Sequence, residues 1–237
     1  MRSPTPSADE LKDVALANRI LAREGVLDGY GHLSARCHDD SACYLIADRT
    51  PPGNVREHNI FPWTLDDEPA GHTHPTYTER FIHGQIYRAR PDVGGIVHCH
   101  APELIPYGAG GPPLRPIYHM AGFQGVEPLP IFEIRAEFGP DTDMLIRTRP
   151  QGESLARALG DRAIVLMRGH GATIAASSVR QAVYFAVYAV MNARILTQTL
   201  LLGGKPTYIN ASEGRNVANV MRDASRTWDY LSAQIPG

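Results

Sequence analysis

Hydrophobic residues follow two spacings along this chain of 237 residues. Apolar positions have the period of an amphipathic helix in five segments, 9–24, 76–89, 151–159, 178–202 and 213–232. Shorter apolar runs typical of strands occupy 32–37, 43–47, 59–63, 94–100 and 163–167, and 117–120 is either a strand or a turn. Because strands and helices mix without strict alternation, the pattern predicts one α/β (α+β) domain over 1–237, a three-layer α/β/α sandwich.

The run at 94–100 carries the first candidate chemistry. His98 and His100 are two positions apart, so in a strand both side chains leave the same face of the sheet. Such a pair is a ready-made chelate for a divalent ion. Cys99 alternates to the other face, where we expect a small buried apolar residue. A lone histidine on an apolar strand is more often a packed side chain than a ligand, so the value of the pair depends on further donors nearby.

Two other segments offer such donors. The run at 163–167 ends in a glycine-flanked turn that carries His170. Glu79 falls in the first turn of the helix predicted over 76–89, where an acidic side chain also complements the positive end of the helix dipole. His83 lies one turn after Glu79. We expect it to be partly exposed, or to hydrogen-bond to the ligand side chains rather than to the metal.

The order of these pieces resembles the class II aldolase/adducin family from about residue 18 to about residue 204. The resemblance is carried by Gly31-His32-Leu33-Ser34-Ala35-Arg36, the Glu79 helix, Val97-His98-Cys99-His100, Ile117-Tyr118-His119-Met120, and the glycine-flanked His170 before a long helix. It implies one catalytic divalent metal ion per subunit, with Glu79, His98, His100 and His170 as ligands. In that family the glutamate serves as ligand, as proton carrier, or as each in turn.

The resemblance also implies an architecture and an assembly. It implies a class II aldolase-like fold with a mostly antiparallel central sheet, and a homotetramer with active sites at subunit interfaces. Three imidazoles suit zinc or manganese, and iron or cobalt is also compatible with them.

Three departures separate the chain from the sugar-phosphate aldolases of the family. His32 stands where they carry asparagine, Tyr77 and Thr78 replace a serine pair, and His119 stands where they use a tyrosine to hand over a proton. The first two alter phosphate-binding features, so a phosphorylated sugar is disfavoured. The segments 95–102 and 116–123 look closer to the family's decarboxylases of hydroxylated phthalates or pyridine dicarboxylates.

This resemblance implies a decarboxylase whose metal chelates a carboxylate and an ortho oxygen of a small aromatic or heteroaromatic acid. Glu79 or His119 would protonate carbon, since both residue types can be tuned toward neutral pKa. The residues expected to contact the substrate are Tyr77, Thr78, His32, Ser34 and Arg115. A second carboxylate calls for a bidentate arginine, and the sequence does not choose among Arg36, Arg49, Arg80, Arg115 and Arg168.

Three alternatives remain open. The first is an aldolase that cleaves a non-phosphorylated hydroxy-carbonyl compound. The second is a non-catalytic scaffold like the adducin heads, although the chain keeps the ligand residues that those heads have lost. The third is metal-dependent oxygenation at iron, because the same ligands leave open positions that oxygen can occupy.

Composition argues against nucleic acid and membranes as partners. The net charge is −2, with 43% apolar and 20% charged residues, so no basic stripe favours nucleic acid. No signal-peptide core opens the chain and its longest apolar stretch is interrupted by polar residues, which predicts a cytoplasmic protein that is not a membrane partner. Three cysteines fit a reducing interior, although a bridge between Cys37 and Cys43 is compatible with their spacing.

Overall fold

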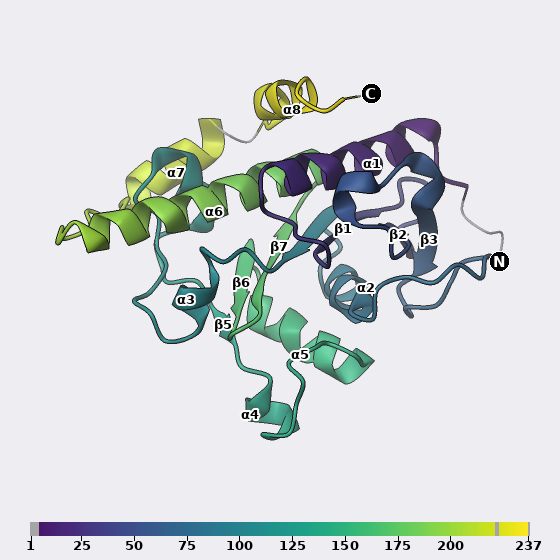
Figure 1. Cartoon of the computed structure of the whole chain (residues 1–237), viewed down its shortest axis with the longest axis horizontal. Helices are drawn as coiled ribbons and strands as arrows, with labels where there is room; N and C mark the ends of the chain where they lie inside the picture. Colours follow the sequence, from purple (N-terminus) through teal and green to yellow (C-terminus); the bar gives the residue numbers. More distant parts are fainter. Residues whose placement is uncertain (1–4, 221–222, 237) are drawn as a thin grey trace.

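Seven strands form one sheet in the computed structural model, which describes residues 5–220 and 223–236 (Figure 1). The strand order is β3-β2-β1-β4-β7-β6-β5, and every pair is antiparallel except β5 with β6. The bounds are β1 (His32–Arg36), β2 (Cys43–Ala47), β3 (Ile60–Thr64), β4 (Gly95–Cys99), β5 (Ile131–Phe132), β6 (Ile164–Met167) and β7 (Gly171–Ala176). The mostly antiparallel sheet is confirmed.

Helices cover both faces of this sheet, which confirms the three-layer prediction (Figure 1). One layer holds α1 (Ala8–Arg23), α6 (Val179–Leu201), α7 (Ala211–Val220) and α8 (Ser225–Ser232), and the other holds α2 (Arg80–Ala89) and α5 (Arg149–Leu159). Short helices lie in the connections: α3 (Ile105–Gly108), α4 (Arg135–Phe138), and the 3₁₀ turns η1 (Pro52–Asn54), η2 (Glu57–Asn59) and η3 (His119–Gln124).

The alternation of side chains along β4 decides which layer each residue meets. Val97 and Cys99 belong to the core beneath α1 and α6, and Cys99 is fully buried there as predicted. Ile96 belongs to the core beneath α2 and α5. His98 is two residues from Ile96 and therefore lies on the α2 side of the sheet.

The start of α2 differs from the prediction. The helix begins at Arg80 rather than near residue 76, so Glu79 is the residue that precedes the helix and not part of its first turn. The reason is that the preceding segment is held by the loop after β2: the Thr76 hydroxyl donates to the Ala47 carbonyl at 2.8 Å, and the Tyr77 hydroxyl donates to the Thr50 carbonyl at 3.1 Å.

Three other segments differ from the expectation. No strand was predicted at β7, because the Gly- and Ala-rich sequence Gly-Ala-Thr-Ile-Ala-Ala has little strand propensity; the strand forms through its pairing with β4 and β6. Segment 117–120 is neither strand nor simple turn, since η3 begins at His119. The helix predicted over 213–232 is split into α7 and α8; positions 221–222 of that prediction lie outside the described residues.

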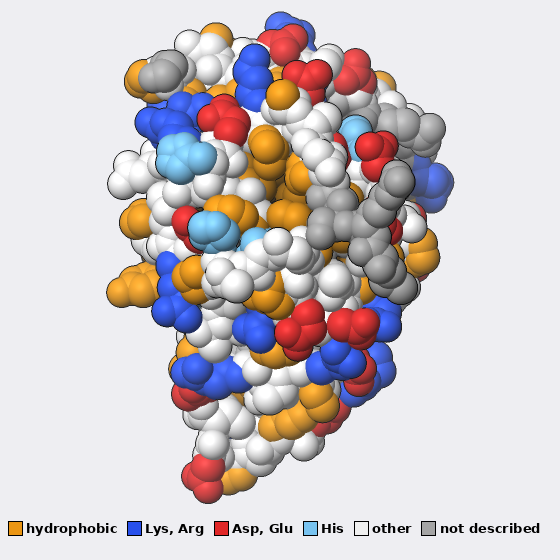
Figure 2. Space-filling view, turned by 90° about the vertical axis from the view of Figure 1, so that its right-hand side faces the viewer, with side chains coloured by type: hydrophobic (Ala, Val, Ile, Leu, Met, Phe, Trp, Pro, Cys, Tyr) orange, Lys and Arg blue, Asp and Glu red, His pale blue; other side chains and the backbone are white. Residues whose placement is uncertain are grey.

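A disulfide joins Cys37 to Cys43 next to the β1–β2 hairpin, the pairing that the sequence left open. Within the described residues, none of the helices combines the length and the apolar character needed to cross a membrane. The described part of the face in Figure 2 mixes basic and acidic side chains and shows no continuous basic stripe.

A buried carboxylate fixes the loop before α2. Asp67 is fully buried and has a positive φ of 62°. It accepts hydrogen bonds from the Gln85 amide at 2.6 Å and the Tyr44 hydroxyl at 3.2 Å, and burial raises its pKa to about 6. Gly84 makes room for this group, because a Cβ at that position would lie 1.9 Å from Asp67 Oδ1.

Gly84→Ala is therefore expected to destabilise the protein by about 2 kcal/mol or more, since the carboxylate that must move is buried and hydrogen-bonded. Urea denaturation measures the effect. Gly53→Ala is the matched control, because its Cβ would make only an ordinary contact of 3.7 Å. Equal stability of both variants would contradict the role assigned to the buried carboxylate.

Candidate metal centre

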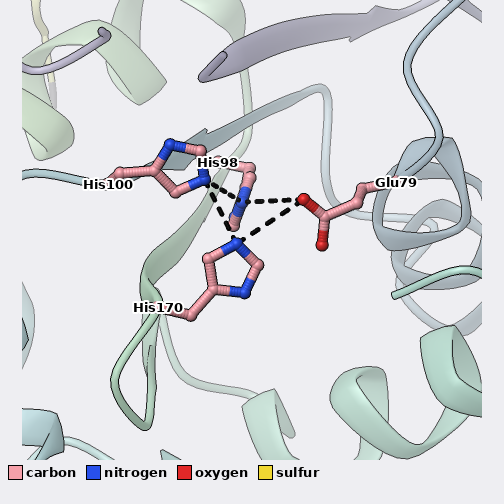
Figure 3. Close-up of side chains that lie close together, drawn as sticks. All are labelled: Glu79, His98, His100 and His170. Carbon is pink, nitrogen blue, oxygen red and sulfur yellow. Dashed lines mark hydrogen bonds and ion pairs between the residues drawn. The ribbon is translucent and has the colours of Figure 1, made fainter. Parts of the chain in front are cut away.

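The four acidic and histidine side chains singled out in the sequence converge on one point (Figure 3). One ligand atom from each of Glu79, His98, His100 and His170 lies within 4.8 Å of every other. His100 Nε2 is 3.2 Å from His98 Nε2 and 3.2 Å from His170 Nε2. Glu79 Oε2 is 3.6 Å from His98 Nε2 and 3.5 Å from His170 Nε2.

Strand pairing brings these side chains together. His98 lies in β4, His100 follows its end, and His170 lies in the turn between β6 and β7. β4 pairs with β7 so that Cys99 is opposite Ala172, which sets the His170 turn beside His100. Gly171 permits this approach, because it has a φ of 151° and a Cβ there would lie 2.0 Å from the Cys99 carbonyl oxygen.

Hydrogen bonds fix the tautomer of each histidine. His100 Nδ1 is 3.1 Å from Asp28 Oδ2, and His170 Nδ1 is 3.0 Å from the Met144 carbonyl oxygen. His98 Nδ1 is 3.3 Å from Thr173 Oγ1, whose own hydrogen is donated to the Met167 sulfur. Since each partner is an acceptor, the ring hydrogens sit on Nδ1 and the three Nε2 lone pairs face the centre.

Glu79 is oriented by the backbone. Its Oε1 accepts a hydrogen bond from the Ile146 N–H at 2.9 Å, so Oε2 is the oxygen that faces the three histidines. The side chain is 9% exposed, which excludes most solvent from the carboxylate.

The electrostatics of the site differ from one histidine to the next. Burial, and then the neighbouring histidines, hold the pKa of His98 well below its usual value, so the ring is neutral. Burial also lowers the pKa of His170, but the Glu79 carboxylate and the Met144 carbonyl outweigh it, and the net pKa is raised. For Asp28 the raising effect of burial is outweighed by the N–H groups of Tyr30 and Gly31 and by His100, so its pKa is lowered.

This donor set fits a divalent transition metal. Zinc bound tetrahedrally at about 2.0–2.1 Å has donor atoms about 3.3 Å apart. Four of the six separations are 3.2 to 3.6 Å and match that value, and the other two are no longer than 4.8 Å. Three imidazole nitrogens and one carboxylate oxygen are also the donor types that zinc and its neighbours prefer. The group is therefore able to hold a metal ion.

Some of the predicted substrate residues lie at this centre. His32 is buried, and its ring centroid is 5.0 Å from that of His98 and 4.5 Å from that of Tyr77. Thr78 is exposed and directly precedes Glu79. Ser34 is fully buried, with its hydroxyl hydrogen-bonded to His83 and Tyr87.

Other predicted residues lie apart from the four ligands. His119 is exposed on η3 against Tyr118, and no contact joins it to the ligand group in the described part of the chain. Arg115 donates to the Val126 carbonyl at 2.7 Å and lies over the Tyr208 ring. His83 is fully buried, so the expectation that it is partly exposed was wrong; α2 turns that residue toward the sheet.

Sequence reasoning missed the residues that support the ligands. Asp28 lies in a glycine-rich turn and accepts from the N–H groups of Tyr30 and Gly31, which the sequence signals only as a turn. Its contact with His100, 72 positions away, has no local signal. The same holds for Thr173 and for the Met144 carbonyl, since both depend on strand and loop packing.

The match to known families covers most of the chain. The model of the class II aldolase and adducin N-terminal domain matches residues 12–197. Decarboxylase tropJ of Talaromyces stipitatus is 37% identical over 77% of this chain and 73% of its own length. The 3,4-dihydroxyphthalate decarboxylase of Arthrobacter keyseri is 33% identical over 85% of this chain and 83% of its own length.

A solved structure agrees on the fold. An aldolase II superfamily protein from Pseudomonas syringae superposes with a TM-score of 0.75 at 20% identity, over 96% of this chain and 92% of that one. The chain thus belongs to the class II aldolase and adducin family. Within that family it is a lyase of the decarboxylase branch.

His100→Ala is expected to abolish stoichiometric zinc binding, because one of three nitrogen donors is lost. Asp28→Ala removes only the group that orients His100 and is expected to weaken binding about 10- to 100-fold. Isothermal titration of metal-free protein with zinc measures both effects, and circular dichroism checks the fold.

His74→Ala is the matched control for this experiment, since His74 stacks on Phe61 outside the ligand group. The centre assigned here is wrong if His100→Ala binds zinc as tightly as this control does.

Proposed function

We propose that the protein is a metal-dependent decarboxylase of a hydroxylated aromatic or heteroaromatic mono- or dicarboxylate. The observation that carries the proposal is the convergence of three Nε2 atoms and one carboxylate oxygen. The names of two relatives support the reaction, and one of them supports the substrate class.

The ion is one divalent metal per subunit, zinc or manganese, held by Glu79, His98, His100 and His170. When bound, it supplies a Lewis acid for a carboxylate and an ortho oxygen of the substrate. Iron and cobalt suit the same donors.

The reaction breaks the bond between the ring carbon and the carboxylate carbon. A proton first reaches that ring carbon while the ortho hydroxyl gives up its own proton and becomes a carbonyl, which makes the carbon tetrahedral. Carbon dioxide then leaves, and the electron pair of the broken bond passes through the ring onto the ortho oxygen, which restores the aromatic ring. Glu79 is the candidate carrier within one chain, because Ile146 holds one of its oxygens and leaves the other facing the site.

His119 is the second candidate proton donor. Its exposed position on η3 suits a role at the site of a neighbouring subunit in the homotetramer that the family resemblance implies. Among the described residues of one chain, His119 makes no contact with the ligand group. Its role as proton donor therefore depends on the homotetramer.

A second carboxylate needs a free guanidinium, and four of the five candidate arginines are already engaged. Arg36 donates to the backbone carbonyls of Tyr87 and Val93, and Arg80 donates to that of Asp67. Arg168 Nε is 2.5 Å from Glu133, and Arg115 has the contacts described above.

Arg49 makes fewer contacts than these four. Its Nε donates to the Thr76 carbonyl at 3.2 Å, but among the residues that the structure describes its guanidinium lies over no aromatic ring and pairs with no carboxylate, unlike each of the other four. The sheet register locates the residue before it. Ser34 pairs with Ile46 and His32 pairs with His98, so Asp48 lies two strands, about 10 Å, from His98, and Arg49 follows it just beyond the end of β2. A bound aromatic dicarboxylate and an arginine side chain together span that separation.

Purified zinc- or manganese-loaded protein is expected to release carbon dioxide from hydroxylated phthalates. Glu79→Gln is expected to slow turnover about 100-fold or more while most of the metal is retained, if Glu79 carries the proton. Carbon dioxide release and metal content are measured on the same samples. Formation of an aldehyde from a hydroxy-carbonyl compound, with no carbon dioxide from any aromatic acid, would instead establish the aldolase alternative.

Arg49→Met is expected to raise KM for a hydroxylated phthalate about 10- to 100-fold, because the variant loses the charge-assisted hydrogen bonds to the second carboxylate. The KM for the corresponding hydroxybenzoate, which lacks the second carboxylate, should stay unchanged. Arg88→Met is the control, since Arg88 forms an exposed ion pair with Asp66. Equal effects of Arg49→Met on both substrates would rule out the assigned contact.

A further inference from the structure

Four buried side chains form one hydrogen-bonded chain beside the metal centre. The Tyr87 hydroxyl is 2.9 Å from Ser34 Oγ, Ser34 Oγ is 2.6 Å from His83 Nδ1, and His83 Nε2 is 2.6 Å from His32 Nδ1. None of the four is more than 2% exposed. A buried polar chain of this kind needs a donor and an acceptor in every link.

Two elements build this chain. β1 supplies His32 and Ser34, which are two residues apart and so share the face of the sheet that carries His98. α2 supplies His83 and Tyr87, which are four residues apart and so share one face of the helix. The chain therefore joins the layer of α2 to the strand row that holds the metal ligand His98.

The hydrogens in this chain can run in two directions. In the first, Tyr87 donates to Ser34, Ser34 donates to His83 Nδ1, and His83 Nε2–H donates to His32 Nδ1. His32 then carries its hydrogen on Nε2, at the edge of the ring away from His83. In the second direction every donor is reversed, and His32 presents an unprotonated Nε2.

The surroundings of Tyr87 select the first direction. The Arg36 guanidinium, which can only donate, has its central carbon 4.8 Å from the centre of the Tyr87 ring. Ser34 is the one acceptor that the Tyr87 hydroxyl hydrogen meets among the described residues. In the second direction that hydrogen would be buried without an acceptor, which costs about 1–3 kcal/mol.

Burial supports one hydrogen per ring. It lowers the pKa of His83 to about 3, so this ring is neutral. A neutral ring that accepts at Nδ1 from Ser34 must donate at Nε2, which is the nitrogen that meets His32.

We propose that this chain makes His32 a permanent hydrogen-bond donor, through Nε2–H, to a substrate oxygen beside His98. Ser34, His83 and Tyr87 are positioning residues that act through His32, and Ser34 is not a direct substrate contact. The identity of the ligand rests on the proposed function, whereas the direction of the chain is a property of the protein itself.

The chemistry of such a donor follows from where charge develops. As carbon dioxide leaves, the ring oxygen gains negative charge, and an N–H already aimed at it stabilises that charge without reorganisation. A histidine with the opposite tautomer would place a lone pair against the same oxygen and repel it.

The test compares two buried tyrosines. Tyr87→Phe removes only the hydroxyl that sets the direction of the chain. Tyr44→Phe is the matched control, because Tyr44 lies 5.6 Å from Tyr87 between ring centres but donates to Asp67 instead. Long-range proton–nitrogen NMR correlations on zinc-loaded, ¹⁵N-histidine-labelled protein identify which nitrogen of His32 carries hydrogen.

In the wild type and in Tyr44→Phe, His32 is expected as the Nε2–H tautomer. In Tyr87→Phe a second, Nδ1–H form is expected, together with a fall in kcat of about tenfold at little change in KM. An Nδ1–H tautomer in the wild type overturns the proposal, and so does a Tyr87→Phe protein that matches Tyr44→Phe in both tautomer and kcat.

Failure of the proposed function would show separately. If the wild type releases no carbon dioxide from any hydroxylated aromatic acid while His32 is the Nε2–H tautomer, the substrate class is wrong and the direction of the chain still stands.

Discussion

The backbone pairing of β4 with β1 on one side and β7 on the other is the constraint on which the rest of the site depends. This pairing places His98 of β4 between two neighbours in the sheet, His32 on β1 and Thr173 on β7. The same register brings the turn with His170 to the end of β4, beside His100. A shift of one residue would turn His98 to the opposite face of the sheet and separate the ligands. Antiparallel pairing thus sets the geometry before any metal is bound.

The second feature of the site is that the protein itself hydrogen-bonds the polar atoms of the ligand side chains that do not face the centre. Each ligand histidine has an acceptor at Nδ1, and Glu79 has a backbone donor at one oxygen. Ligands held in this way lose little freedom when an ion binds, which favours affinity and a defined geometry. The chain from Tyr87 to His32 is hydrogen-bonded in the same way, and it ends at His32 next to the His98 ring.

The family membership and the local structure agree on the kind of chemistry. The two relatives named above are decarboxylases, and the fold is that of the class II aldolases. His32 lies beside His98, Tyr77 lies beside His32, and Arg49 contacts the same segment as Tyr77 through the Thr76 carbonyl. In the function proposed above, these are the residues that meet the substrate ring and its second carboxylate.

The sequence alone determined the parts of this protein that depend on short-range patterns. Strand alternation put His98 and His100 on one face, glycines marked the turn at His170, and the order of these pieces with Glu79 indicated the family. Most helices and strands were also predictable, because their apolar periods are local. The tertiary structure decided what no local pattern records: β7, the start of α2 after Glu79, the acceptors Asp28 and Thr173, and the burial of His83. These depend on strand pairing and on contacts between residues far apart in sequence, and such contacts leave no periodic trace in the chain.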